Sequence, residues 1–201
     1  MSFVCKYCQR PFAKEKTLTS HICVKKRRYQ QENETGVQLG FNTYLKFYQT
    51  TQISNKKRTY DDFADSDFYN AFVRFGRYLV DIRCINSSSF VDWLLKNNKK
   101  LDHWCKEGVY MEWLNQYMCK ESVQDAMERA LKEMQEYADN DPRLENSFSN
   151  YFRLGAGNRI CKHISDGRIS PWIVFNCTSG INWLSQINQE QLNIIMPIIN
   201  P

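Results

Sequence analysis

The sequence predicts a mainly α-helical protein. Gly and Pro are scarce, with 8 and 5 among 201 residues, and this scarcity disfavours an all-β fold built on tight turns. Apolar side chains instead recur at three- and four-residue spacing in successive segments, as they do along one face of a helix. A hydrophobic content of 42%, with 14% aromatic residues, can supply a buried core. We therefore expect a series of helices joined by short connections.

The N-terminal segment FVCKYCQRPFAKEKTLTSHIC (residues 3–23) has the spacing of a metal site. Cys5 and Cys8 form a C-x2-C pair, whose thiolates can converge on one cation from a tight turn. Twelve residues lie between Cys8 and His21, a spacing that suits a returning helix. Phe12 and Leu18 lie between and can form the small core that so short a segment needs, because it cannot fold on apolar burial alone.

The pattern F-x-C-x2-C-x3-F-x5-L-x2-H resembles a C2H2 zinc finger over residues 3–25, about an eighth of the chain. The resemblance implies a small ββα module, with a hairpin over about 3–12 and a helix over about 14–23. It also implies Zn²⁺ as the cofactor. The ligands that match the pattern of the family are Cys5, Cys8 and His21.

The sequence departs from the family after His21, where a second His or Cys is expected three to five residues on. Cys23 is the nearest candidate and gives a C2HC variant. On a regular helix, residues two apart point to nearly opposite sides. Cys23 can therefore be a ligand only if the helix unwinds or tightens after His21. The alternatives are a fourth ligand from elsewhere, an open catalytic zinc site, and ordinary buried thiols.

The charge is distributed unevenly along the chain. Residues 1–58 hold 12 Lys/Arg and 3 Asp/Glu, a balance of +9, whereas residues 59–201 hold 15 and 19, a balance of −4. This asymmetry predicts a basic arm that meets a polyanion and a separate, mildly acidic body. A basic arm that is only solvated is the alternative.

Three groups of residues are predicted to contact nucleic acid. By the resemblance, the helix positions that face base edges in DNA-reading fingers correspond to Lys14, Thr17 and Ser20. Two basic runs can neutralise phosphates regardless of base sequence. One finger reads only about three base pairs, so most of the binding would come from phosphate contacts. The two runs are Lys25, Lys26, Arg27 and Arg28, and Lys56, Lys57 and Arg58.

The remainder of the chain predicts a multi-helix domain. The serine-proline pair at 170–171 predicts a helix start, and WIVFNC (172–177) fits either a buried helix or a strand. Gly155, Gly157 and Gly167 are interpreted as helix stops. The amphipathic segments, in order, are 37–50, 67–82, 87–98, 108–118 and 122–138.

We predict three parts: a finger with its basic extension (1–28), a basic connector with one helix (29–60), and an α-helical domain (61–201). The last is subdivided near NDPRLENS (140–147). No apolar stretch approaches the roughly 18 residues that span a bilayer, and no signal peptide is recognisable. We expect a soluble intracellular protein without a membrane partner, in which the eight cysteines are metal ligands or free thiols.

These observations favour a zinc-finger protein that binds nucleic acid, DNA rather than RNA, while the helical body engages a protein partner. The alternative is a zinc-stapled adaptor between proteins, in which the acidic helical body makes the contacts. An enzyme is disfavoured, because only the aspartate-rich DDFADSD (61–67), scattered His and Cys residues and the loop GRISPW (167–172) suggest chemistry. The richness in Asn, Lys, Tyr and Ile is typical of AT-rich genomes and suggests a phage protein located in the host cytoplasm.

Overall fold

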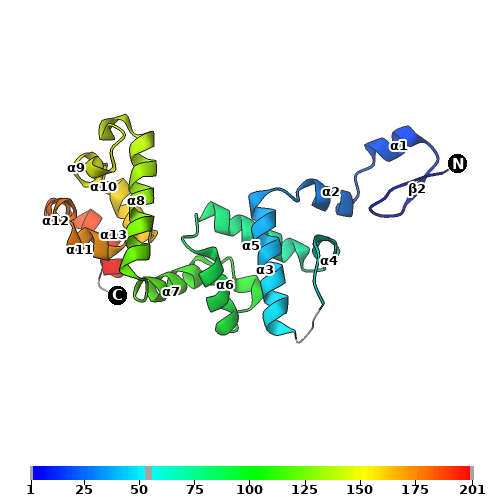
Figure 1. Ribbon diagram of the computed structural model, residues 1–201, viewed down its shortest axis with the longest axis horizontal. Coiled ribbons are helices and arrows are strands. Elements are labelled where there is room, and N and C mark those ends of the chain that lie inside the picture. Colours follow the sequence, from blue (N-terminus) through cyan, green and yellow to red (C-terminus); the bar gives the residue numbers. More distant parts are fainter. Residues whose placement is uncertain (1, 53–55, 200–201) are drawn as a thin grey trace. The chain divides into compact units, whose positions relative to one another are not determined.

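A computed structural model describes residues 2–52 and 56–199 and confirms a mainly helical fold (Figure 1). One small two-stranded sheet precedes the helices in these residues. None of the helices described is long and apolar enough to cross a membrane. The elements are β1 (Phe3–Val4), β2 (Pro11–Phe12), α1 (Glu15–Ser20), α2 (Val24–Gln30), α3 (Thr35–Thr51), α4 (Tyr60–Ala64), α5 (Tyr69–Asp81), α6 (Ser87–Lys96), η1 (Leu101–His103), α7 (Glu107–Met118), α8 (Val123–Asn140), η2 (Pro142–Leu144), η3 (Phe148–Asn150), α9 (Tyr151–Leu154), α10 (Gly157–Ser165), α11 (Pro171–Asn176), α12 (Thr178–Leu184) and α13 (Gln189–Ile199).

The chain divides into two compact units, Met1–Val109 and Tyr110–Pro201. The first unit contains the sheet and the helices α1 to α6. The second contains the helices α8 to α13. The finer boundaries expected from composition, near residues 28, 60 and 140–147, stay predictions.

Helices α3 and α5 form the centre of the first unit, where they pack at very close range (Figure 1). Glycines permit this approach. A Cβ atom placed on Gly40 would lie 2.6 Å from the carbonyl oxygen of Phe72, and one on Gly76 would overlap the carbonyl oxygen of Gly36. Three small residues thus let two backbones touch without intervening side chains. At one end of the contact, Arg77 donates two hydrogen bonds of 2.7 and 2.8 Å to the Glu34 carboxylate.

The aromatic core of the first unit lies beside this helix pair. Phe72 and Phe75 of α5 are fully buried together with Phe90 of α6. Trp104 is also fully buried, with its ring centroid 5.1 Å from that of Phe75. The indole N–H of Trp104 donates to the Lys99 carbonyl oxygen at 2.8 Å, so this buried donor has a partner, as interior polar groups require.

The second unit is built around α8. Its inner face contributes Ala130, Met134 and Tyr137 to a core that includes residues of α9, α10, α11, α12 and α13. Buried Glu133 lies 3.3 Å from an Arg168 nitrogen and 3.6 Å from His163. The guanidinium of Arg168 neutralises a carboxylate that would be costly to bury alone.

Most of the predicted helices are present within a few residues of their expected bounds, and WIVFNC is a helix. Three details of the sequence interpretation are wrong. Gly157 begins α10 rather than ending a helix. Phe68, expected on the apolar face of the segment 67–82, precedes α5 and is 53% exposed. The finger helix ends at Ser20, three residues early. The pattern of apolar residues alone does not determine the residue at which a helix begins or ends.

Candidate metal centre

The hairpin at the N-terminus turns sharply between the first two cysteines. β1 and β2 are antiparallel, with Phe3 opposite Phe12. The Cys5 amide donates to the Arg10 carbonyl at 3.0 Å, and the Gln9 amide donates to the Cys5 carbonyl at 2.8 Å. Gln9 has a φ of 59°, the left-handed conformation that tight turns use. This turn places the side chains of Cys5 and Cys8 on the same side of the hairpin.

The early end of α1 explains how Cys23 reaches the other three ligands. His21 is extended (φ −70°, ψ 124°), and so is Cys23 (φ −92°, ψ 167°). In an extended chain, residues two apart point to the same side, whereas on a helix they would diverge. Ile22, between them, points away and is 57% exposed. The chain is therefore no longer helical at His21, and this is the condition under which Cys23 can be a ligand.

Four side chains converge at this place: Cys5, Cys8, His21 and Cys23. Their ligand atoms all lie within 4.8 Å of one another, and the Cys8 sulfur is 3.3 Å from Nε2 of His21. In a tetrahedral zinc centre with Zn–S bonds of about 2.3 Å, the sulfurs lie roughly 3.8 Å apart. The cluster is within about 1 Å of that size and can hold a metal ion.

The electrostatics of the cluster favour a bound cation. A hydrogen bond from the backbone N–H of Cys8 lowers the pKa of Cys5. The Arg10 N–H acts on Cys8 in the same direction, but desolvation and the nearby thiols of Cys5 and Cys23 outweigh it, and the pKa of Cys8 is raised. Crowded thiolates repel one another. A divalent cation among them removes that repulsion and favours full deprotonation.

The cluster has little apolar support. Cys5 is the one buried residue of the segment 2–23. Phe12 and Leu18 are only half-buried, although the Phe12 ring lies 4.7 Å from that of His21, centroid to centroid. The miniature core predicted from the sequence exists, but it is small. Bonds to a metal would therefore supply most of the stability of this segment.

Helix α2 follows the cluster directly and packs on α4. The Cys23 sulfur accepts a hydrogen bond from the Lys26 amide at 3.4 Å and so caps this helix. Lys25 Nζ lies 3.2 Å from Asp61 and 2.7 Å from Asp65. Hydrogen bonds from Tyr29 and Lys25 lower the pKa of Asp61, and hydrogen bonds to Asp65 and Asp61 raise that of Lys25. These groups stay charged near neutral pH.

Several of the cations that are predicted to contact nucleic acid also bind groups within the chain. Arg28 donates to the Ala64 carbonyl at 2.6 Å. Lys26 donates to the His21 carbonyl at 2.9 Å. Lys56 pairs with Asp62 at 2.6 Å. The guanidinium of Arg58 donates to Gln52 at 2.6 Å and to the Tyr44 hydroxyl at 3.1 Å, and it lies over the Tyr48 ring at 3.9 Å.

The other predicted contacts lie on the surface. Lys14, Thr17, Arg27 and Lys57 are exposed, and within the described residues none of these three cations is in an ion pair. The Ser20 hydroxyl donates to the Lys16 carbonyl at 3.1 Å. Sequence reasoning passed over three further exposed cations of this segment, because they lie outside the basic runs and the base-reading positions. They are Lys6, Arg10 and Lys16.

The aspartates of DDFADSD form ion pairs and caps rather than a metal site. Asp61 and Asp65 bind Lys25, as described above. Asp62 accepts from the Thr59 amide at 2.8 Å and completes a capping box. The Lys56 ammonium, with that amide, lowers the pKa of Asp62 to about 2. In the part of the chain that the structure describes, no second group of three His, Cys or acidic side chains gathers as closely as the cysteine-histidine cluster.

Comparison with known proteins identifies no relative: no family model, curated protein or solved structure matches this chain.

Proposed function

We propose that this protein binds one Zn²⁺ through Cys5, Cys8, His21 and Cys23. The observation that carries the proposal is the convergence of these four ligand atoms within 4.8 Å. Three thiolates and one imidazole are a typical donor set for a structural zinc site. With four protein ligands, no coordination position remains for a reacting water. The bound zinc therefore serves as a cross-link that holds the hairpin to the chain after α1.

We propose further that the finger (residues 3–23) and its basic surroundings bind nucleic acid through phosphate contacts, with DNA preferred to RNA. Residues 1–30 hold eight Lys/Arg and one Asp/Glu. Three thiolates and Zn²⁺ would add a charge of about −1, so the segment stays strongly positive. Exposed cations support this role, because they can release counterions from phosphates without first breaking an ion pair. The candidates are Lys6, Arg10, Lys14, Lys16, Arg27 and Lys57.

The test is fluorescence anisotropy of labelled duplex and single-stranded DNA at a series of salt concentrations. We expect binding that weakens steeply with salt. In the triple variant Lys14→Gln, Arg27→Gln, Lys57→Gln, the slope of log affinity against log salt should fall by about three, roughly one for each lost phosphate contact.

A matched control removes the same charge elsewhere. The variant Lys120→Gln, Lys132→Gln, Lys162→Gln loses three exposed cations of the second unit and should keep the wild-type slope. Equal losses in both variants would contradict a finger-centred interface, since they would reflect net charge alone. Absence of binding at low salt would also contradict it.

The second candidate function is a zinc-stapled adaptor between proteins. The specific observation in its favour is that Lys25, Lys26 and Arg28 are already engaged within the chain. In that case the basic run fixes the finger to α4 rather than to a phosphate backbone. Zinc binding with no affinity for either form of DNA would favour this function.

A further inference from the structure

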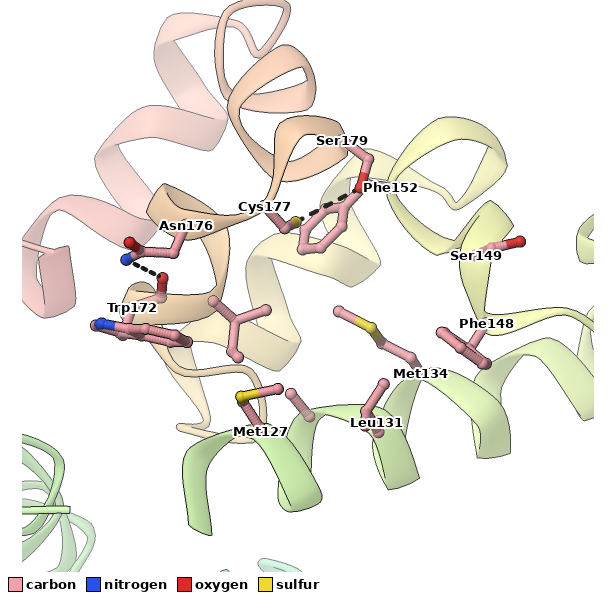
Figure 2. A pocket seen from close by; sticks show the side chains of 12 residues that line it. Met127, Leu131, Met134, Phe148, Ser149, Phe152, Trp172, Asn176, Cys177 and Ser179 are labelled. Carbon is pink, nitrogen blue, oxygen red and sulfur yellow. Dashed lines mark hydrogen bonds between the residues drawn. The ribbon is translucent and has the colours of Figure 1, made fainter. Parts of the chain in front are cut away.

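The second unit has an apolar hollow that plays no part in the proposed zinc or nucleic-acid function. The hollow, here called the groove, has a volume of about 400 Å³. Figure 2 shows Met127, Leu131 and Met134 of α8 along one side, and Trp172 of α11 across from them. Phe148 closes one end. The groove lies wholly within the second unit.

Four large apolar side chains around the groove are exposed next to one another. Met127 is 43% exposed, Leu131 44%, Phe148 45% and Trp172 40%. A contiguous exposed patch of large apolar side chains on a soluble fold typically marks an interaction site. Met127 and Met134 add adaptability, because unbranched thioether side chains fill irregular spaces.

The two walls of the groove differ in charge. The wall formed by α11 and α12 belongs to a stretch, residues 169–189, that contains no Asp, Glu, Lys, Arg or His. The opposite wall, α8, carries five acidic and two basic residues. At 100° per residue, Glu128 lies about 60° and Asp139 about 80° around the helix from Leu131. Both are exposed, and they form the acidic flank of the groove.

The two carboxylates of the acidic flank are bound by amide groups and not by cations. Glu128 accepts a hydrogen bond from Gln124 at 2.9 Å, and Asp139 accepts one from Gln135 at 2.6 Å. Within the described residues neither carboxylate is in an ion pair. The three nearest cations bind other groups: Arg129 binds Glu121, Arg143 pairs with Asp141, and Lys132 lies 3.9 Å from Glu136. The flank therefore presents negative charge beside an apolar floor, and it favours a partner with cations beside its own apolar face.

We propose that this groove binds a cationic amphipathic helix of a protein partner. Met127 and Met134 are seven residues apart, so the floor extends about 10 Å along α8. A partner helix parallel to α8 would place its i, i+4 and i+7 side chains over that same length. Its apolar anchors would enter between α8 and Trp172, and its Lys or Arg residues would face Glu128 and Asp139. Nucleic acid and anionic lipid are disfavoured, because the flank repels them.

The experiment measures anisotropy of two fluorescent peptides against the full-length protein. Both peptides are designed helices with the same Leu positions, and the remaining positions are Lys in one and Glu in the other. We expect the Lys peptide to bind and the Glu peptide not to bind at the groove. Leu131→Lys should weaken the Lys peptide at least tenfold, because it places a charge in the apolar floor. Glu128→Lys should weaken it about threefold to tenfold through loss of complementarity.

Matched controls separate the groove from general effects. Ile181→Lys changes an apolar residue that is 51% exposed but lies outside the groove, and Glu190→Lys reverses an exposed charge on α13. Both should bind the Lys peptide like wild type. Wild-type affinity in Leu131→Lys would overturn the proposal.

Two further readouts test other occupants. If the protein binds vesicles of anionic lipid, and Leu131→Lys abolishes that binding while the Lys peptide does not bind, a membrane is the occupant and the proposal is wrong. Sedimentation of the protein alone tests a second copy of the chain. A dimer that Leu131→Lys dissociates, without peptide binding, would likewise overturn the proposal.

Discussion

The substitution Gly76→Ala is expected to destabilise the first unit by more than about 3 kcal/mol, at or beyond the upper end of ordinary overpacking costs. The added methyl group would overlap the carbonyl oxygen of Gly36. That neighbour is helix backbone and not the end of a flexible side chain, so α3 and α5 would have to separate. Separation would also loosen the packing of Phe72 and Phe75. Denaturant unfolding followed by circular dichroism measures the loss.

Gly108→Ala is the matched control. Gly108 lies in α7, and a Cβ atom there would meet no other atom within 4 Å. Alanine loses less backbone entropy on folding than glycine does, so this variant should be slightly more stable than wild type. The same substitution is thus expected to lower the free energy of unfolding at position 76 and to raise it at position 108. Equal effects would mean that α3 and α5 are not in backbone contact.

Removal of the metal is expected to unfold the finger and to leave the helices of both units folded. Only Cys5 is buried between residues 2 and 23, so apolar burial cannot hold this segment together, and apparent zinc-binding free energies of about 10–16 kcal/mol are what fold such modules. Limited trypsin digestion measures the effect. A chelator should greatly accelerate cleavage after Lys6, Lys14 and Lys16, while α5 and α8 stay protected.

Two variants test whether the protection from trypsin depends on the metal ligands. Cys5→Ser should be cleaved rapidly even with zinc present, because it removes a ligand. Cys119→Ser changes an exposed thiol in the second unit and should behave like wild type. A finger that resists trypsin equally with and without chelator would show that no metal is needed for its fold.

The helical class and the four residues that converge at the N-terminus could be predicted from the sequence because both depend on local spacing. Amphipathic periodicity is a property of consecutive residues, and so is the C-x2-C pair. The inner face of α3 was harder to predict. The apolar pattern of this segment consists of Leu39, Phe41, Tyr44, Leu45 and Tyr48. Of these only Tyr44 is buried, and the buried stripe continues through Gly36, Val37 and Gly40. A glycine has no hydrophobic side chain, so close backbone contact leaves no apolar pattern.

The contacts made by the basic run at residues 25–28 also could not be predicted from local sequence patterns. Lys25 is separated from Asp65 by forty residues, and nothing near Lys25 indicates that pairing. Helix α2 was not predicted either, because its residues, VKKRRYQ, lack an apolar stripe. It is capped by the Cys23 sulfur. A run of charges gives the potential for phosphate binding, but the tertiary fold decides which cations remain exposed.

Titration with Co²⁺, followed by absorption spectroscopy and native mass spectrometry, is the most direct test of the metal centre. We expect one ion per chain, the d–d bands of a tetrahedral centre, and charge-transfer absorption from three thiolates that falls by about a third in Cys23→Ser. Zinc should displace the cobalt. A six-coordinate spectrum, or an unchanged charge-transfer band in Cys23→Ser, would contradict a centre formed by Cys5, Cys8, His21 and Cys23.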